Sequence, residues 1–284
     1  MGIDKDVAKF LLSARERKAN FQKSLMLGNQ KFQVSDYHCR TLAQTFKLND
    51  FPIIESGADF FSFLGAEEIS AMDFSDYEGA AILHDLNKPI GEELKEKFTF
   101  VLDGGTLEHI FNFPVALANA MEMVEVGGHL AVIAGGNNFL GHGFYQFSPE
   151  LFYGAFAAEN GFVVERMIVA EVGGKWYEVA DPKAVKGRVE LINDCPVYLM
   201  VLARKLESRP IFAETPQQSD YVAIWQSDAE NQRGKNSPSR LKNLLKKNKF
   251  VRQTLINIKQ KQMENLFRSE RSFANKKLFK LVDK

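Results

Sequence analysis

The sequence predicts an α/β fold: a mostly parallel sheet of seven strands with helices on both faces. The first observation behind this prediction is the run from Phe98 to Ala134, which has the pattern of strand, acidic turn, helix and strand without interruption. That order is one half of a nucleotide-binding α/β sheet. The second is that other short apolar runs of strand length lie on both sides of it along the chain.

The central run has clear local signals. Phe98 to Leu102 is mostly apolar and rich in β-formers, as expected of a parallel strand covered on both faces. The next helix opens at Asn112-Phe113-Pro114, where Asn can cap and Pro suits the first turn, and Gly127-Gly128 ends it before a strand at 129–134. Ligands of open α/β sheets bind beyond the carboxyl ends of the strands. The residues expected in that crevice are Asp103, Gly104, Gly105, Glu108 and His109.

The remaining elements follow from similar patterns. Residues 4–22 have apolar side chains on one helical face, and we expect this helix to pack across the sheet edge. A further helix begins at Ser148-Pro149 and ends at Asn160-Gly161. About forty residues separate the first two strand ends, which is long for one crossover helix, so 35–46 and 59–64 are expected to form extra helices or a lid. The other five strands are expected at Ser24–Leu27, Ile69–Met72, Gly79–Leu83, Phe162–Val169 and Val197–Ala203.

The composition is that of an ordinary folded protein with one α/β domain and an appendage. The chain has 284 residues, of which 45% are hydrophobic and 25% charged. No apolar run reaches the roughly 18 residues of a membrane span, and the N-terminus is charged where a signal peptide needs an apolar segment. We therefore expect a cytoplasmic protein. Cys39 and Cys195 lie far apart without metal-ligand neighbours, so we expect reduced thiols and no metal site.

The charge is unevenly distributed along the chain. Residues 235–284 carry 15 Lys or Arg and 3 Asp or Glu, a net charge of +12, so residues 1–234 carry −12. We expect a domain at 1–205, a proline-containing linker at 206–239 and a basic, amphipathic helical tail at 240–284. The tail is open to three interpretations: a solvated or protein-docking extension, a segment that binds an anionic membrane surface and makes the protein peripheral to it, or an RNA-binding segment. RNA is favoured least, because the tail lacks the sheet context of RNA-stacking modules.

Leu107-Glu108-His109-Ile110 is followed by the helix, the Gly-Gly pair and the strand described above. In this segment the chain resembles the second half of class I S-adenosylmethionine-dependent methyltransferases. It also resembles a group of bacterial methyltransferase-like proteins with a reduced first motif and a His-Gly-Phe-Tyr-Gln-Phe-Ser-Pro segment, here His142–Pro149. The likeness covers about residues 20–205. It implies a Rossmann-like sheet whose last two strands form an antiparallel edge pair, S-adenosylmethionine as cofactor, and methyl transfer.

Acidic residues follow the second and third strands. Asp73 lies at the end of the second strand, where a carboxylate accepts both ribose hydroxyls of a nucleotide, and Phe74 can cover the adenine. The alternative is a turn-forming Asp. The resemblance also implies that Asp85 receives the adenine amino group and that the backbone amide of Leu86 meets the ring, although Asp85 would equally suit a polar turn.

The first motif is reduced. Family members usually have an acid followed by Gly-x-Gly-x-Gly, whose missing side chains let the backbone approach the cofactor, whereas this chain has one glycine in Leu27-Gly28-Asn29-Gln30-Lys31. The resemblance implies that Gly28, with Asn29 or Gln30, contacts the methionine end of the cofactor. A chain that has lost cofactor binding would have the same sequence at this site.

The resemblance places the cofactor floor at Asp103–Gly105 and Glu108, and the catalytic group close by. A base is needed only if the nucleophile is a hydroxyl or a protonated amine. His109 is the first candidate, followed by His142 and Tyr145; alternatively, His109 packs on the cofactor or caps its helix. The loop at 135–146 is rich in glycine and aromatic residues and would select the acceptor, while Phe144 and Phe147 are expected to pack under the next helix.

The resemblance implies methyl transfer to a small-molecule or surface-glycan-related acceptor. The first alternative is a non-catalytic protein that keeps the fold for binding or scaffolding, which the reduced first motif favours. A nicotinamide-dependent reductase is less favoured, because the chain has neither Gly-x-Gly-x-x-Gly nor Tyr-x-x-x-Lys. The basic tail leaves RNA modification as a further alternative.

Overall fold

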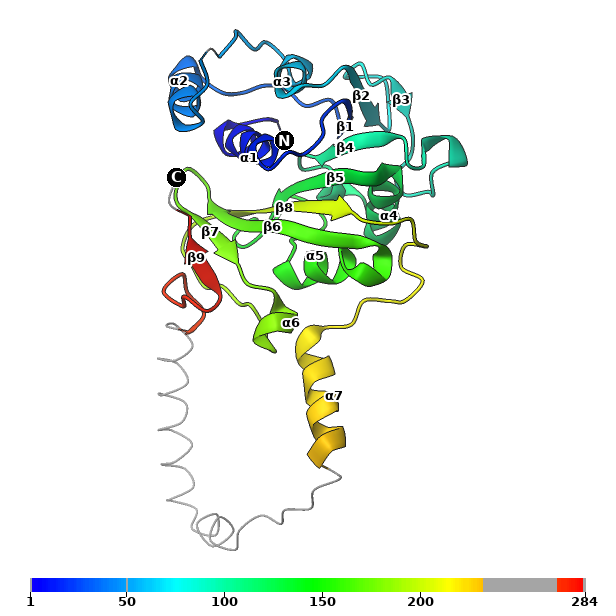
Figure 1. Cartoon of the computed structure of the whole chain (residues 1–284), viewed down its shortest axis with the longest axis vertical. Coiled ribbons are helices and arrows are strands. Elements are labelled where there is room, and N and C mark those ends of the chain that lie inside the picture. The colour runs from blue at the N-terminus through cyan, green and yellow to red at the C-terminus, as the bar shows by residue number, and fades with distance from the viewer. Residues whose placement is uncertain (1, 50, 232–269, 283–284) are drawn as a thin grey trace, which may run out of the picture.

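One mixed sheet of nine strands organises the described part of the chain, which is residues 2–49, 51–231 and 270–282 of the computed structural model (Figure 1). The strands are β1 (Lys23–Leu27), β2 (Glu68–Asp73), β3 (Ile82–Leu83), β4 (Phe98–Asp103), β5 (Val124–Gly135), β6 (Phe162–Glu171), β7 (Trp176–Val179), β8 (Val197–Lys205) and β9 (Phe279–Leu281). The α-helices are α1 (Lys5–Glu16), α2 (Asp36–Thr45), α3 (Gly57–Leu64), α4 (Phe113–Met123), α5 (Pro149–Ala155), α6 (Pro182–Val185) and α7 (Ser219–Asn231). Short 3₁₀ turns are η1 (Glu92–Leu94), η2 (Leu107–His109) and η3 (Ala158–Asn160).

The strand order is β3-β2-β1-β4-β5-β8-β6-β7-β9. The first five strands in this order are parallel, and β8 lies antiparallel between β5 and β6. Because β1 and β4 are neighbours while the chain continues from β1 towards one edge and from β4 towards the other, their carboxyl ends form a topological switch point. The first seven positions have the order and directions of the class I methyltransferase fold, which confirms the predicted fold class.

The sheet has nine strands where the sequence predicts seven. The strands β6 and β8 do form an antiparallel pair, but they are not at the edge, because β7 pairs with β6 and β9 pairs with β7. The side chain of Phe279 in β9 is buried, and Phe273 stacks on Tyr177 with ring centroids 3.9 Å apart. The prediction of a separate tail over 240–284 is therefore wrong for Phe279–Leu281, which form the ninth strand of the sheet. The lysine-rich composition conceals this short strand.

The predicted linker at 206–239 contains a helix, α7, that the sequence did not predict. The helix begins where the Glu150 carboxylate accepts hydrogen bonds from the amide and hydroxyl groups of Ser219, each 2.7 Å long. Arg188 pairs with Asp220 at 2.7 Å in the same turn. The apolar positions that predict an amphipathic tail, from Leu241 to Ile258, lie outside the described residues, so docking through the tail stays a prediction.

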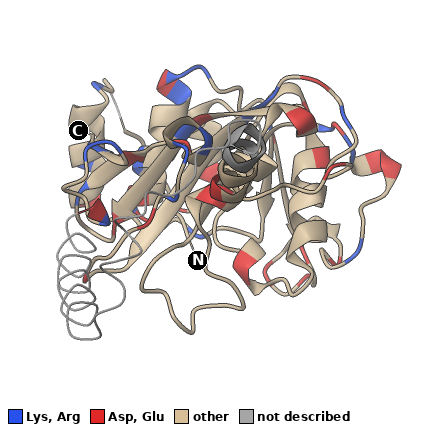
Figure 2. Ribbon diagram, turned by 90° about the horizontal axis from the view of Figure 1, so that it is seen from below, with Lys and Arg blue, Asp and Glu red and all other residues tan. Residues whose placement is uncertain are grey.

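Helices cover both faces of the sheet, as the sequence predicts. Successive residues of a strand point to opposite faces: Leu25 and Leu27 pack in the cluster of α4 and α5, whereas Met26 packs in the cluster of α1 and α3. The helix α1 lies on a face and not across the edge, because its buried residues, Phe10 and Leu11 among them, make a wide apolar stripe that an edge cannot cover. Figure 2 shows charged residues mainly in helices and loops, with the strands largely uncharged.

One local prediction differs in detail from the structure, and another is confirmed. The helix α4 begins after Asn112 as expected but ends at Met123, and Gly127-Gly128 belongs to β5, where Gly127 has a φ of +91° and the register with β4 shifts. The segments at 35–46 and 59–64 form α2 and α3, which confirms the extra helices. No helix among the described residues is long and apolar enough to cross a membrane.

Substitution of Phe279 tests whether the end of the chain is part of the sheet. Phe279→Ala should lower the free energy of unfolding by about 3–5 kcal/mol, because it removes a buried aromatic side chain that is 1% exposed. Leu281→Ala in the same strand, where the side chain is 40% exposed, should lower it by less than about 1 kcal/mol. Equal, small effects in denaturant unfolding would contradict the docking of β9.

Candidate functional site

The carboxyl ends of β1, β2 and β4 meet around Gly28. Its backbone has a φ of +72°, and its amide donates a hydrogen bond to the Met72 carbonyl oxygen, 2.7 Å away. A Cβ atom at this position would lie 3.2 Å from Thr106 Oγ1 and 3.9 Å from Asp73 Oδ2. Glycine is therefore required here by its conformation, and its neighbours come from the turns that follow β2 and β4.

Gln30 lies buried between the ends of β1 and β4. Its Nε2 donates to the Leu27 carbonyl oxygen at 2.9 Å, whereas its Oε1 has no hydrogen-bond partner among the described residues. A Cβ atom on Gly104 would lie 2.7 Å from this Oε1, so a side chain at this position would require the Gln30 amide to shift. The space that the missing side chain of Gly104 leaves is thus occupied by Gln30.

Asp73 faces Gly28 from the end of β2. Its Oδ1 accepts a hydrogen bond from the Phe74 amide at 2.6 Å, which also supports the turn, while the Phe74 ring is 76% exposed. Asn29 points away from β4 and donates to the Glu78 carbonyl oxygen at 2.6 Å. Asn29 therefore holds the loop after β2 against the turn after β1, and its side-chain amide is engaged in this bond.

Asp85 lies in a polar turn after β3. Its Oδ1 accepts hydrogen bonds from the backbone and side-chain amides of Asn87, which lower the pKa of Asp85, and Lys88 lies 3.4 Å from its Oδ2. Leu86 is buried in the core cluster of α4. The geometry therefore favours the alternative interpretation, in which Asp85 stabilises a polar turn.

Asp103 is a buried carboxylate at the end of β4. Its Oδ1 accepts hydrogen bonds from the amides of Thr106 at 2.8 Å and Leu107 at 3.2 Å, and its Oδ2 has no partner among the described residues. Burial, followed by the repulsion of the nearby Glu108 carboxylate, raises the pKa of Asp103 to about 8. Gly105 has a φ of +90°, which lets the chain turn sharply away from the strand.

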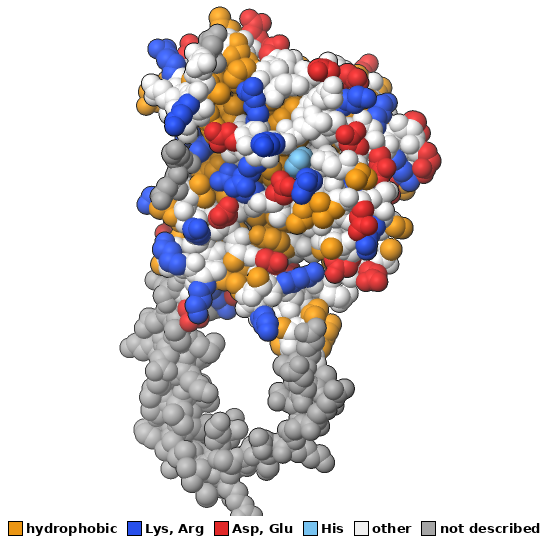
Figure 3. Space-filling model, in the orientation of Figure 1, with side chains coloured by type: hydrophobic (Ala, Val, Ile, Leu, Met, Phe, Trp, Pro, Cys, Tyr) orange, Lys and Arg blue, Asp and Glu red, His pale blue; other side chains and the backbone are white. Residues whose placement is uncertain are grey.

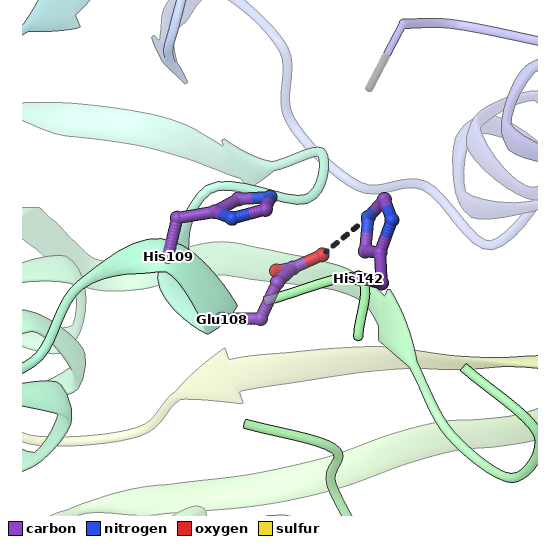
Figure 4. A group of neighbouring side chains, drawn as sticks. All are labelled: Glu108, His109 and His142. Atoms are coloured by element: carbon purple, nitrogen blue, oxygen red, sulfur yellow. Dashed lines mark ion pairs between the residues drawn. The ribbon is translucent and has the colours of Figure 1, made fainter. Parts of the chain in front are cut away.

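Glu108, His109 and His142 come together in front of this turn, as Figure 4 shows. The Glu108 side chain is 0% exposed, and burial raises its pKa. His142 Nε2 lies 3.6 Å from Glu108 Oε1, and the rings of His109 and His142 have centroids 5.3 Å apart. Both imidazoles are exposed. The two first-ranked base candidates thus share one buried carboxylate.

The loop at 136–148 folds back on η2. The Glu108 carbonyl oxygen accepts hydrogen bonds from the amides of Phe144 at 2.9 Å and Tyr145 at 3.3 Å. A Cβ atom on Gly143 would lie 2.8 Å from the same oxygen, so glycine permits this close approach. The Tyr145 hydroxyl donates to the Phe111 carbonyl oxygen at 2.7 Å, which engages its proton in fixing the loop.

The two phenylalanines of this loop behave differently. Phe147 is buried against the core, as predicted, but Phe144 is exposed and meets the exposed Phe111 edge to face, with ring centroids 5.7 Å apart. The prediction that Phe144 packs under the helix is wrong, because the backbone pairing with Glu108 turns its side chain outward.

Sequence analysis did not single out two contributors. Thr106 Oγ1 donates to the Leu27 carbonyl oxygen at 2.8 Å and joins the β4 turn to β1. Phe139 contacts His142 edge to face and stacks on Tyr198. A hydroxyl residue three positions after a strand-end Asp was a usable signal for Thr106; nothing local indicated Phe139.

Figure 3 shows one face of the molecule, where Asp and Glu side chains lie among Lys and Arg side chains and apolar residues. Basic side chains of this face thus have acidic neighbours. On this face the acidic side chains lie in several places and not in one patch.

No protein-family model matches the chain, and neither does any curated protein. Among solved structures, it is similar to a 1,6-didemethyltoxoflavin-N1-methyltransferase from Burkholderia thailandensis with bound S-adenosylhomocysteine (TM-score 0.41, 17% identity, 72% of this chain and 78% of that one). It is also similar to the YcgJ protein from Bacillus subtilis (TM-score 0.41, 10% identity, 71% and 98%). A third is a branched-chain polyamine synthase from Thermus thermophilus (TM-score 0.39, 14% identity, 76% and 60%). These TM-scores are too low to support an argument, so the fold is assigned from the strand order of this chain.

The raised pKa of Asp103 predicts a pH dependence of stability. A carboxyl group with a raised pKa in the folded state contributes stability that is fully present below its ordinary pKa of 3.8 and is lost as the pH rises through about 8. The free energy of unfolding should therefore fall between about pH 5 and about pH 8, by at most about 1.4 kcal/mol per pH unit for one proton.

Asp103→Asn should make this fall shallower, because the variant keeps an oxygen for the Thr106 and Leu107 amides but cannot ionise. Asp85→Asn is the matched control. Its lowered pKa places its titration below this pH window, so the slope should not change. Denaturant unfolding of the three chains measures the slopes; parallel curves for Asp103→Asn and the wild type would contradict a raised pKa.

Proposed function

We propose that the chain is an S-adenosylmethionine-dependent methyltransferase that acts on a small-molecule acceptor. The single observation that carries the proposal is that the turns after β1, β2 and β4 converge at the β1–β4 switch point, where Asp73 faces Gly28. A carboxylate at the end of the second strand can accept both ribose hydroxyls, and the glycine lets the backbone approach the ligand.

The polar groups of the crevice fit the methionine end of such a cofactor. Gln30 Oε1 and Asp103 Oδ2 are both buried acceptors without partners among the described residues. Buried acceptors of this kind are destabilising unless something donates to them. The ammonium group of the cofactor is a donor that matches them, and the predicted cofactor roles of Gln30 and Asp103 form part of this proposal.

When bound, the cofactor would supply an activated methyl group on a sulfonium. The protein then has to align the acceptor with that methyl group and exclude water, since positioning alone can contribute roughly 7–11 kcal/mol. His109, in η2 after β4, and His142, in the loop after β5, are exposed and can accept the proton of a hydroxyl acceptor. The Tyr145 hydroxyl is bonded to the Phe111 carbonyl oxygen, so we assign it to positioning the loop.

Exposed aromatic side chains border this region and suit a small acceptor. Phe111 and Phe144 form an edge-to-face pair from two different loops, and Phe74 is exposed beside the Asp73 carboxylate. Apolar and aromatic surfaces with few polar groups are typical of small-molecule sites. A surface-glycan-related acceptor is the narrower form of this proposal and comes from the sequence resemblance alone.

A second candidate function is a non-catalytic protein that keeps the fold for binding or scaffolding. One specific observation favours it: the Gln30 amide lies over Gly104, in space that a ligand at the switch point could use. Methyl transfer then requires that the Gln30 side chain bind the cofactor or move aside. The two candidate functions make different predictions for S-adenosylhomocysteine, the product formed from the cofactor: a methyltransferase should bind it, and a non-catalytic protein need not.

Titration calorimetry with S-adenosylhomocysteine tests the proposal. The wild type should bind with a micromolar Kd, and Asp73→Asn should weaken binding at least about tenfold, because a charge-assisted hydrogen bond contributes about 1.5–3 kcal/mol. Asp76→Asn is the control, since Asp76 lies in the same loop but is exposed and outside the crevice. No heat from a folded wild-type chain would favour the non-catalytic function, and an equal loss in both variants would contradict the role of Asp73.

A further inference from the structure

The cluster of Glu108, His109 and His142 has the composition of a metal site. The three side chains offer one carboxylate oxygen and two imidazole nitrogens, and these donor atoms all lie within 4.8 Å of one another. In Figure 4 the two imidazoles stand on either side of the carboxylate. We propose that these three residues bind one divalent transition-metal ion, with Zn²⁺ as the fitting species.

The buried carboxylate supplies an independent observation. Both oxygens of Glu108 are buried without a hydrogen-bond partner among the described residues, and the side chain is 0% exposed. Glu108 Oε1 lies 3.6 Å from His142 Nε2, which is too long for a hydrogen bond. A buried carboxylate without a hydrogen-bond partner is destabilising, and a bound cation would remove that penalty.

The donor set indicates the class of metal. Two imidazoles and one carboxylate suit zinc and other first-row divalent ions, whereas Mg²⁺ and Ca²⁺ prefer ligand sets made of oxygen. Donors at about 2.0–2.2 Å from one metal lie roughly 3–3.5 Å apart. The described donors therefore have to approach by about an ångström, which rotation of the two exposed rings can supply.

The surrounding contacts hold the ligands from two separate elements. His109 and Glu108 belong to η2, while His142 comes from the loop after β5. That loop is fixed by the hydrogen bond from the Phe144 amide to the Glu108 carbonyl oxygen, and Phe139 packs against the His142 ring. Three protein ligands leave a coordination position open, as in catalytic zinc sites, so an acceptor oxygen could bind there.

The metal site does not depend on methyl transfer, and its test uses the metal alone. With the ion bound, the two imidazoles would be ligands and would not act as the proton acceptors of the proposed function. The full chain, first treated with a chelator, is titrated with Zn²⁺ in a calorimeter, and Co²⁺ binding is followed by visible absorption. We expect one ion per chain with a micromolar or tighter Kd. His142→Gln, His109→Gln and Glu108→Gln should each weaken binding at least about tenfold and reduce the Co²⁺ absorption.

Two features keep this test decisive. His142 is on a loop with its side chain 36% exposed, so His142→Gln should fold even if Glu108→Gln does not. His84→Gln is the matched control, because the His84 ring bonds to the Lys88 carbonyl oxygen, away from the cluster, and this variant should bind Zn²⁺ like the wild type.

Two results would overturn the proposal. The first is a folded wild-type chain that takes up no Zn²⁺ at millimolar concentration, which would reduce the cluster to an ion pair between Glu108 and His142. The second is binding that persists in His142→Gln but disappears in Cys39→Ser, which would place the ion at the neighbouring His38 and Cys39 of α2.

Discussion

The carbonyl oxygen of Leu27 is the point on which the geometry of the crevice depends. It accepts hydrogen bonds from Thr106 Oγ1 at 2.8 Å and from Gln30 Nε2 at 2.9 Å. One atom at the end of β1 thus fixes both the turn after β4 and the side chain that lies between the two strands. The positive φ of Gly28 turns the chain immediately afterwards, so that the turns after β1, β2 and β4 converge.

Two buried carboxylates beside this point make the site an energetically unfavourable region that the surrounding sheet must stabilise. Glu108 lies close enough to Asp103 to disfavour its charge, and three of the four oxygens of the two residues have no hydrogen-bond partner among the described residues. The sheet around them is almost wholly apolar, with Val101, Leu102 and Leu130 fully buried. Such strain at the end of a well-packed strand is typical of functional sites.

Much of the domain could be predicted because its signals are local. Asn112 and Pro114 mark a helix start, and the apolar run from Phe98 marks a buried strand, so the central unit followed from neighbouring residues alone. The strand β9 could not be predicted, because its three residues gain their structure by pairing with β7, across a long sequence separation. Its extended conformation depends on tertiary contacts and not on propensity.

The same distinction applies to the candidate site: local signals predict some of its residues, and tertiary contacts place the others. The sequence brings Asp73 and Asp103 to strand ends, because parallel strands place their carboxyl ends on one edge of the sheet. It does not show that Gln30 folds back over Gly104, since a side-chain conformation depends on the packing around it. The contact between His142 and Glu108 could not be predicted either, because it requires the loop after β5 to form backbone hydrogen bonds with η2.

A crystal structure of the chain grown with S-adenosylhomocysteine tests the central claim most directly. We predict that the ligand lies at the β1–β4 switch point, with its ribose hydroxyls on the Asp73 carboxylate and its methionine end beside Gly28 and the Gln30 amide. Crystals grown with saturating ligand that show Gln30 still over Gly104 and no ligand in the crevice, or the ligand at another place, would contradict it.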